Sequence, residues 1–255
     1  MNIREIDAYL NAVPMEALNY EMNQFRCDPR AGVQNLLQKY EKRLDAYRNE
    51  LLRLDNMMLY ERKYADYGLI AGIDEAGRGP LAGPVVAAAV ILPKDHPILY
   101  VNDSKQLSEK KREELYDVIL RDAVSWGTGM ASEKVIDEIN ILQATYRAMA
   151  EAFSKLSPKS GITLNDAVKV PQITIRQVPI IKGDAKSASI AAASIVAKVT
   201  RDRLMVKYDE LYPEYGFRRH KGYGSQEHLE ALRKYGPCEI HRKTFIGGIL
   251  GLDNE

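Results

Sequence analysis

The sequence has few of the features that mark a secreted or membrane protein. Its 255 residues include two cysteines, Cys27 and Cys238, which lie far apart and form no metal-ligand pair. The longest apolar run, residues 85–92, is far shorter than the ~20 residues that a membrane-spanning helix needs. The first ten residues, "MNIREIDAYL", lack the apolar segment of a signal peptide. We therefore expect a soluble cytoplasmic protein in a reducing compartment, with no membrane partner; a single disulfide between the two cysteines is the alternative.

An excess of charge of either sign is also absent. The chain has 36 Lys and Arg residues against 35 Asp and Glu residues, so net charge neither indicates nor excludes a nucleic-acid partner. A composition of 45% apolar and 28% charged residues is typical of an ordinary globular protein. The length allows one large domain, or one domain with an extension.

The first 66 residues contain no aliphatic run typical of a buried strand. Apolar residues between Leu36 and Met58 recur at spacings of three and four, which predicts an amphipathic helix of about 30 residues. Pro14 and the segment "CDPRAG" predict shorter helices before it. We interpret residues 1–66 as a helical extension that packs against or positions another part of the protein, and residues 67–255 as the main domain.

From Tyr67 onward, strand-like runs alternate with amphipathic helices. Strands are expected in "YGLIAGIDEAG", "GPVVAAAVILP", "VSWGTGMAS", "GITLNDAV" and "ITIRQVPIIKG". Helices are expected in "SEKKREELYDVILRDA", "EKVIDEINILQATYRAMAEAFSKL", "SIAAASIVAKVTRDRLMVKYDELY" and "SQEHLEALRKYG". A hairpin-like start followed by this alternation predicts a mixed α/β domain.

Acidic residues follow three of the strand-like runs. Asp74 and Glu75 follow "LIAGI", Asp166 follows "GITLN" and Asp184 follows "VPIIKG". Strand ends of an open α/β sheet are where ligand crevices form. Carboxylates that meet there would repel one another unless a cation lay between them, and an all-oxygen donor set favours Mg²⁺ or Mn²⁺ over zinc. Two such ions suit attack on a phosphodiester. The structural alternatives are a turn at Asp166 and a helix cap at Asp184.

The loop after the first acidic pair is rich in glycine. Because neighbouring residues of a strand point to opposite faces, we expect the chain to leave regular strand geometry where Asp74 and Glu75 share a site. Gly77, Gly79 and Gly83 provide that freedom and let backbone N–H groups approach a phosphate. The loop lacks the Lys-Ser/Thr ending of a P-loop and the spacing of a dinucleotide fingerprint.

Residues 218–243 collect cations close to aromatic residues. Clustered cations with Tyr215, Phe217 and Tyr223 among them suit a duplex backbone, and a solvated helical face is the alternative. Three histidines of the segment have a spacing that fits no zinc motif. The cations are Arg218, Arg219, Lys221, Arg233, Lys234, Arg242 and Lys243, and the histidines are His220, His228 and His241.

Four blocks of the sequence resemble bacterial ribonuclease HII, of the type 2 ribonuclease H family. They are "GIDEAGRGPLAGPVVAAAVIL", "NDSKQLSEKKREEL", "IIKGDAKSASIAAASIVAKVTRDRLM" and "YPEYGFRRHKGYGSQEHLEALRKYGPCEIHRKTF", and they occur in the family's order over most of residues 68–245. The N-terminal extension is similar to that of one Gram-positive subgroup. The resemblance implies a ribonuclease H-like fold, with a mixed five-stranded sheet flanked by helices and a helical C-terminal part.

The resemblance also implies an activity and a set of site residues. The activity is metal-dependent endonucleolytic cleavage of RNA in RNA–DNA hybrids, and cleavage 5′ of single ribonucleotides in duplex DNA, leaving 3′-hydroxyl and 5′-phosphate ends. Its acidic quartet falls on Asp74, Glu75, Asp166 and Asp184, with Asn165 in place of the usual apolar neighbour of the third acid. We expect these to be catalytic and to hold two Mg²⁺ or Mn²⁺ ions, with Asp74 bridging both. The substrate-binding candidates are Gly77, Arg78, Gly79, Ser104, Lys105 and the junction-sensing Tyr223.

Three other functions remain open on the residues alone. They are another nuclease or resolvase of the same fold, a nucleic-acid-binding protein without catalysis, and a small-molecule phosphohydrolase that uses the glycine-rich loop. Cleavage of a duplex with one embedded ribonucleotide, but not of its all-DNA equivalent, separates the first from ribonuclease HII. We expect the partner to be nucleic acid and the protein to be a monomer.

Overall fold

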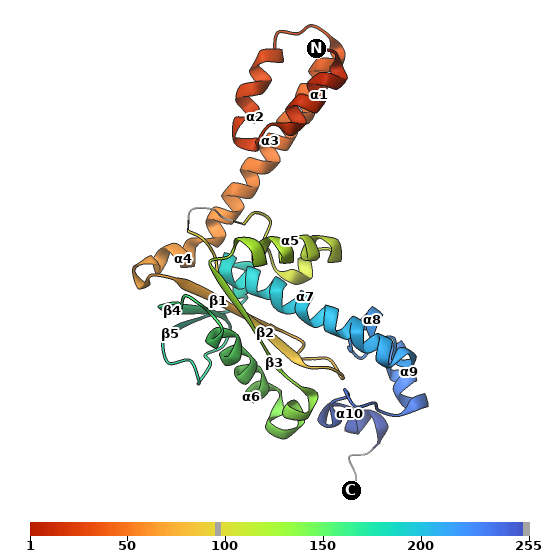
Figure 1. The fold of residues 1–255 in the computed structure, drawn as a ribbon. Helices are drawn as coiled ribbons and strands as arrows, with labels where there is room; N and C mark the ends of the chain where they lie inside the picture. Colours follow the sequence, from red (N-terminus) through yellow and green to blue (C-terminus); the bar gives the residue numbers. More distant parts are fainter. Residues whose placement is uncertain (95–97, 252–255) are drawn as a thin grey trace. The chain divides into compact units, whose positions relative to one another are not determined.

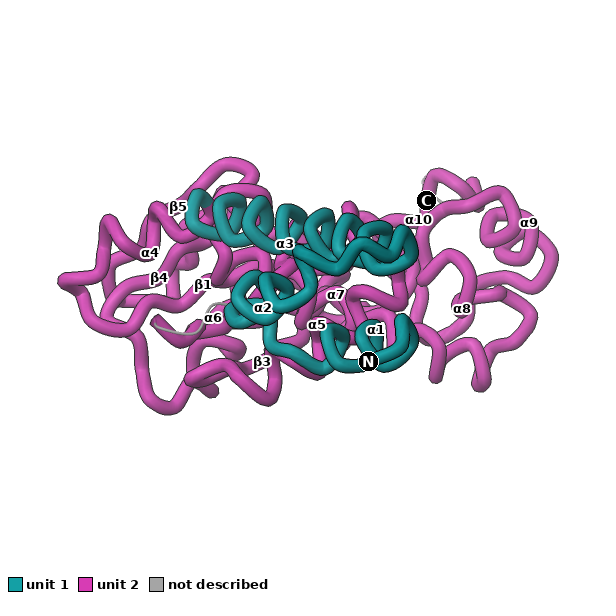
Figure 2. Tube along the Cα trace, turned by 90° about the horizontal axis from the view of Figure 1, so that it is seen from above, with its two compact units in different colours: residues 1–56 teal, residues 57–255 magenta. Residues whose placement is uncertain are grey.

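The computed structural model describes residues 1–94 and 98–251. The chain divides into two compact units, Met1–Asn56 and Met57–Glu255, which Figure 2 shows in different colours. Both cysteines are free thiols. Within the described ranges, no helix combines the length and the apolar character that crossing a membrane requires.

The smaller unit is helical. Its elements are α1 (Ile3–Ala12), α2 (Met15–Met22), the 3-10 turn η1 (Asn23–Phe25) and α3 (Ala31–Met57). Asn2 and Glu5 form a capping box, in which each side chain accepts a hydrogen bond from the other residue's backbone N–H. The long helix expected from the spacing of apolar residues is confirmed as α3. Its buried face packs with α1 and α2 through Ile6, Leu10, Leu18, Met22, Val33, Leu36, Leu37, Tyr40 and Leu44.

The larger unit is built on a mixed five-stranded sheet, as expected. The strands are β1 (Ile70–Ala76), β2 (Val85–Ile91), β3 (Ser125–Ala131), β4 (Ile162–Asp166) and β5 (Arg176–Ile180), in the order β3-β2-β1-β4-β5. β1, β2 and β3 pair antiparallel, whereas β4 pairs parallel to both β1 and β5. β1 is therefore the central strand, and its C-terminal end lies beside the C-terminal end of β4.

Helices cover both faces of this sheet (Figure 1). α6 (Glu133–Ser154) packs against β1, β2 and β3, and α7 (Ala188–Leu211) packs against β1 and β2. The other helices of this unit are α4 (Leu59–Lys63), α5 (Glu109–Asp122), α8 (Phe217–His220), α9 (Gln226–Tyr235) and α10 (Lys243–Leu250), with 3-10 turns η2 (Ala65–Tyr67), η3 (Ser104–Gln106), η4 (Gly183–Ala185) and η5 (Pro213–Tyr215). α7 lies so close to β1 that a Cβ on Gly72 would come within 2.0 Å of the backbone of Ser189. Ala71 and Ile73 face α6 instead. The alternation of β1 thus directs Asp74 toward α7.

One expected helix is interrupted. α6 was expected to be continuous, but Asn140 has a φ of 66° and breaks it. The Asn140 side chain accepts hydrogen bonds from the backbone N–H groups of Leu142 and Gln143, at 3.0 and 3.1 Å, so it caps the second part of the helix. The apolar pattern continues across the break because both parts face the same sheet.

The C-terminal elements form a separate apolar cluster around α8 and α9. Tyr215 and Phe217 are buried in it with Leu232 and Ile240. The sequence-based expectation that these two aromatic residues belong to a nucleic-acid surface is therefore wrong, because their rings serve packing. Tyr223 is exposed and remains available.

Candidate active site

One cavity of about 450 Å³ contains all ten residues expected at the site. It is open at the C-terminal ends of β1 and β4, between the glycine-rich loop after β1 and the N-terminal half of α7. Ser194 and Lys198 of α7 also line it, and the sequence had not singled them out. The lining residues are Asp74, Glu75, Ala76, Gly77, Arg78, Gly79, Ser104, Lys105, Asp166, Asp184, Ser194, Lys198 and Tyr223.

Asp74 and Glu75 reach the cavity from an ordinary strand. The register of β1 with β2 is regular through both residues to Ala76, so the expectation that the chain leaves strand geometry at the pair is wrong. The pairing of β4 with β1 ends at Ile73 and Asn165. Beyond this point the edge of β1 is open on that side, and the cavity extends around it. Side chains on opposite faces of the strand therefore border the same space.

Asp166 and Asp184 are tied together by the backbone. Asp166 is the last residue of β4, and its Oδ1 accepts a hydrogen bond of 2.7 Å from the N–H of Gly183. Gly183 begins the η4 turn that carries Asp184. The alternative role of Asp184 as a helix cap is wrong, because the side chain of Ser187 caps α7 by accepting a hydrogen bond from the N–H of Ile190.

Burial and the proximity of other carboxylates raise the pKa of Asp74, Glu75 and Asp184. Burial, followed by the charges of Glu75 and Asp166, raises the pKa of Asp74 well above its usual value. Burial also raises the pKa of Glu75, although the adjacent guanidinium of Arg78 opposes it. Burial and neighbouring aspartates raise the pKa of Asp184. Concentrated negative charge of this kind is relieved by a cation.

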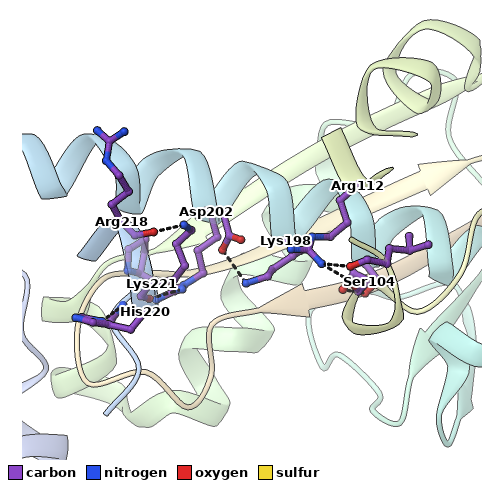
Figure 3. Close-up of polar contacts among 12 residues, drawn as sticks. Ser104, Arg112, Lys198, Asp202, Arg218, His220 and Lys221 are labelled. Carbon is purple, nitrogen blue, oxygen red and sulfur yellow. Dashed lines mark hydrogen bonds and ion pairs between the residues drawn. The ribbon is translucent and has the colours of Figure 1, made fainter. Parts of the chain in front are cut away.

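Positively charged and hydroxyl groups also line the cavity. Burial lowers the pKa of Lys105, but the surrounding aspartates outweigh this effect and raise it. The hydroxyl groups of Ser104 and Ser194 share a hydrogen bond of 3.0 Å, which attaches η3 to α7. Figure 3 shows Lys198 farther along α7, where its Nζ donates to Asp202 at 2.8 Å. The ammonium group of Lys105 is thus positioned beside the carboxylates, whereas that of Lys198 is paired with Asp202.

A buried arginine holds the glycine-rich loop. Arg242 donates hydrogen bonds to the carbonyl oxygens of Gly77 at 2.6 Å, Arg78 at 2.9 Å and Gly83 at 2.9 Å. Its side chain has no exposed surface, so the expectation that it contacts a duplex is wrong. Burial lowers the pKa of Arg242 to about 9, and it stays cationic at neutral pH. Its guanidinium fork fixes three carbonyls at once.

Arg201 of α7 supports the same loop from the other side. It donates to the carbonyl oxygens of Ala82, Pro84 and Lys221, at 3.0, 2.9 and 2.9 Å. A Cβ on Gly77 would lie 2.1 Å from Nε of Arg201, and Gly77 has a φ of +93°, so only glycine fits there. Sequence reasoning missed both arginines as loop supports, because nothing local distinguishes an arginine that binds carbonyls from one that faces solvent.

Tyr223 stands at the rim of the cavity. Its side chain is exposed, with 46% of the residue surface accessible. Gly79 lies opposite, where an added Cβ would be 3.9 Å from Cε1 of the ring, and the Arg201 guanidinium is 6.0 Å from the ring centroid. The ring therefore faces the backbone of the glycine-rich loop across the entrance.

Part of the expected basic surface is neutralised locally. Arg218 forms an exposed ion pair with Asp209 at 3.4 Å, and Arg219 pairs with Glu227. Figure 3 shows Lys221 turned back toward the carbonyl of Arg218, to which its Nζ donates. These contacts favour the solvated-face alternative for this stretch.

The acidic side chains supply the oxygen donors that a divalent cation needs, although they are not close enough to one another to coordinate it as they stand. Among residues 1–94 and 98–251, no three His, Cys, Asp or Glu side chains are close enough to hold a metal ion as they stand. The four carboxylates nevertheless border one cavity and supply only oxygen atoms, the donors that Mg²⁺ and Mn²⁺ prefer. Binding an ion requires these side chains to turn inward, where their mutual repulsion is relieved.

Comparison with known proteins identifies the family. The model for Ribonuclease HII matches residues 71–247, and the model for the Ribonuclease HII N-terminal domain matches residues 2–65. The chain belongs to the ribonuclease HII family. The Ribonuclease HII of Lachnoclostridium phytofermentans is 58% identical over 248 residues, which cover 96% of this chain and 98% of that protein. The resemblance seen in the four sequence blocks is therefore confirmed.

Solved structures show the same fold. The ribonuclease H2 from Pyrococcus horikoshii OT3 matches with a TM-score of 0.60 and 28% identity, over 72% of this chain and 97% of that one. The Bst-RNase HIII in complex with Mn²⁺ matches with a TM-score of 0.55 and 18% identity, over 66% of this chain and 63% of that one. As a member of the ribonuclease HII family, the protein is a ribonuclease H, a nucleic-acid-cleaving hydrolase of the endonuclease type.

Proposed function

We propose that this ribonuclease cleaves RNA within RNA–DNA hybrids and cleaves duplex DNA on the 5′ side of a single embedded ribonucleotide, leaving 3′-hydroxyl and 5′-phosphate ends. Its role is then the removal of ribonucleotides from DNA. The observation that carries this proposal is one cavity that combines four carboxylates with a glycine backbone and an exposed tyrosine. Family membership supports the class of reaction, and the cavity supports the specificity.

Asp74, Glu75, Asp166 and Asp184 are the proposed catalytic residues. They would hold Mg²⁺ or Mn²⁺, and two bound ions would activate a water molecule for attack on phosphorus and stabilise the leaving oxygen. Lys105 lies beside these carboxylates and is suited to bind the scissile phosphate. The hydrogen bond of Ser104 to α7 keeps this lysine at the cavity wall.

The glycine-rich loop is proposed to recognise the ribonucleotide. Distinguishing RNA from DNA requires contact with the 2′-hydroxyl, which is both a donor and an acceptor. The backbone of Gly77, Arg78 and Gly79 can approach it because two of the three residues have no side chain, and Arg242 fixes the loop from behind. Tyr223 is positioned to stack on the next sugar and exclude a 2′-hydroxyl there, which produces a preference for an RNA–DNA junction.

In this proposal, the protein has two functional parts. Residues 1–66 serve as a positioning module and residues 67–255 as the catalytic domain with its C-terminal helices. The protein acts as a cytoplasmic monomer on nucleic acid. Matches of separate family models to residues 2–65 and 71–247 support this division.

A cleavage assay tests the function. A duplex with one ribonucleotide is compared with its all-DNA equivalent over a range of Mg²⁺ and Mn²⁺ concentrations, with wild type and Asp74→Asn. We expect cleavage only of the first substrate, and loss of cleavage with largely intact hybrid binding in the variant. Cleavage of the all-DNA duplex would identify a nuclease of different specificity. Binding without cleavage by the wild type would identify a binding protein, and release of phosphate from nucleotides would identify a phosphohydrolase.

A further inference from the structure

Two buried histidines and a half-buried third form a group close to the backbone of Tyr223. His228 of α9 and His241 are almost completely buried, and their Nε2 atoms are 3.0 Å apart. The ring of His220 stacks on His228, with 4.6 Å between centroids. Tyr215 and Phe217 pack around them. These histidines do not line the cavity, so the chemistry described above does not use them.

The hydrogen bonds determine where each proton lies. The backbone N–H of Cys238 donates to Nδ1 of His241 at 2.9 Å, so the neutral ring of His241 carries its proton on Nε2. That Nε2–H donates to Nε2 of His228, whose own proton is therefore on Nδ1. The Nδ1–H of His228 donates to the carbonyl oxygen of Tyr223 at 2.9 Å. Every donor in this series points in one direction, from Cys238 to Tyr223.

The environment keeps both rings neutral. Burial lowers the pKa of His241 to about 4, and burial also lowers the pKa of His228. Cys238 and Tyr215, which contact His241, are neutral as well, because burial raises the pKa of Cys238 to about 11 and that of Tyr215 to about 12. Burial also lowers the pKa of His220, the ring that stacks on His228. A proton on either imidazole would place two N–H donors face to face, so the series requires neutral rings.

The position of Tyr223 depends on its backbone. Its ring is too exposed to be fixed by packing, and the two preceding residues, Lys221 and Gly222, both have left-handed conformations with φ of 52° and 84°. Such a turn is costly for a non-glycine residue, by about 1–2 kcal/mol, and needs support. The N–H of Tyr223 donates to the carbonyl of His220 at 3.0 Å, and its carbonyl accepts from Ser225 as well as from His228.

We propose that His241 and His228 form a histidine relay that holds the backbone of Tyr223 at the rim of the cavity, and that both are positioning residues for junction specificity. The role in specificity rests on the function proposed for Tyr223. The hydrogen-bond direction does not depend on that function, so the two parts can be tested separately.

The first test measures the protonation of the rings in the full-length protein. Imidazole ¹⁵N chemical shifts at pH 7 distinguish Nδ1–H, Nε2–H and doubly protonated histidine. The expected result is Nδ1–H for His228 and Nε2–H for His241. The opposite tautomers, or a doubly protonated ring at either position, would overturn the relay.

The second test compares variants by their junction preference, measured as the ratio of cleavage rates on a single-ribonucleotide duplex and on an all-RNA hybrid. His228→Leu loses the donor to Tyr223, and we expect the preference to fall about tenfold, the factor that corresponds to one hydrogen bond of about 1.4 kcal/mol. His228→Asn keeps an N–H near the Nδ1 position and is expected to recover most of the preference. Phe217→Leu is the matched control, since it disturbs the same apolar cluster without removing a hydrogen bond.

The outcomes separate this inference from the proposed function. A wild-type protein without junction preference would overturn the proposed function together with the specificity role of the relay. A wild-type preference that survives His228→Leu would overturn the relay inference alone. An equal loss in Phe217→Leu and His228→Leu at matched thermal stability would also overturn it, because packing would then account for the effect.

Discussion

Acidification should destabilise the protein through His241, and His241→Gln should remove that sensitivity. The pKa of His241 is about 4 in the folded state, because the ring is buried beside His228, against 6.5 for the ordinary group. The folded state therefore disfavours protonation that the unfolded chain accepts. The stabilising contribution is complete above pH 6.5 and is lost progressively as the pH falls toward 4.

The size of the effect follows from these two pKa values. Relative to neutral pH, protonation of His241 in the unfolded chain removes about 2 kcal/mol of unfolding free energy at pH 5 and about 3 kcal/mol at pH 4. Glutamine does not titrate in this range, and its side-chain amide can still donate toward His228. Wild type should be more stable than His241→Gln at pH 7.5, and the difference should shrink by about 2 kcal/mol at pH 5.

Urea denaturation followed by circular dichroism measures this difference. Both proteins are unfolded at pH 7.5 and pH 5 in a metal chelator, so that titration of the cavity carboxylates affects them equally. An equal loss of unfolding free energy in wild type and His241→Gln between pH 7.5 and pH 5 would show that the pKa of His241 is the same in the folded and unfolded states. The neutral, buried ring on which the relay depends would then be refuted.

Three further predictions concern the cavity. Mg²⁺ or Mn²⁺ should raise the thermal unfolding midpoint of wild type but not that of Asp74→Asn. In chelator above pH 7 the variant should be at least as stable as wild type, because a buried carboxylate with a raised pKa opposes folding as the pH rises. A lower midpoint of the metal-free variant than of the metal-free wild type would contradict this. Arg242→Lys should lower kcat more than tenfold, since a single ammonium nitrogen cannot replace the planar fork whose three nitrogens each reach a different carbonyl. Unchanged kinetics would exclude a role of Arg242 in holding the loop. Tyr223→Ala should reduce junction preference more than affinity in cleavage and binding assays, and an equal effect on both would exclude it from junction sensing.

Much of the fold was predictable because the buried face of a helix or strand requires apolar residues at regular spacings in the sequence. The five strands and the long helices follow from apolar spacing. The break in α6 was not predictable, because both parts present apolar residues to one sheet. Only the backbone at Asn140 reveals it.

The acidic part of the candidate site was predictable for a topological reason. Asp166 ends a strand parallel to β1, and parallel strands bring their C-terminal ends to one edge. How Asp74 and Glu75 share a cavity was not predictable, because it depends on where β4 stops. The roles of Arg201 and Arg242 were also hidden, since their partners are carbonyl oxygens, which leave no mark in a sequence.

α4, which lies within residues 1–66, contacts the helix that lines the active-site cavity, α7. Oε1 of Glu61 accepts hydrogen bonds from the hydroxyl of Ser187 at 2.6 Å and from the N–H and hydroxyl of Ser189 at 3.0 and 2.7 Å. A carboxylate at the start of the 24-residue α7 is favoured by the helix dipole, and it anchors the helix just after the turn that carries Asp184. A chain beginning at residue 57 keeps this contact, whereas one beginning at residue 67 loses it. The last ten residues of the extension therefore belong, by packing, to the scaffold of the cavity.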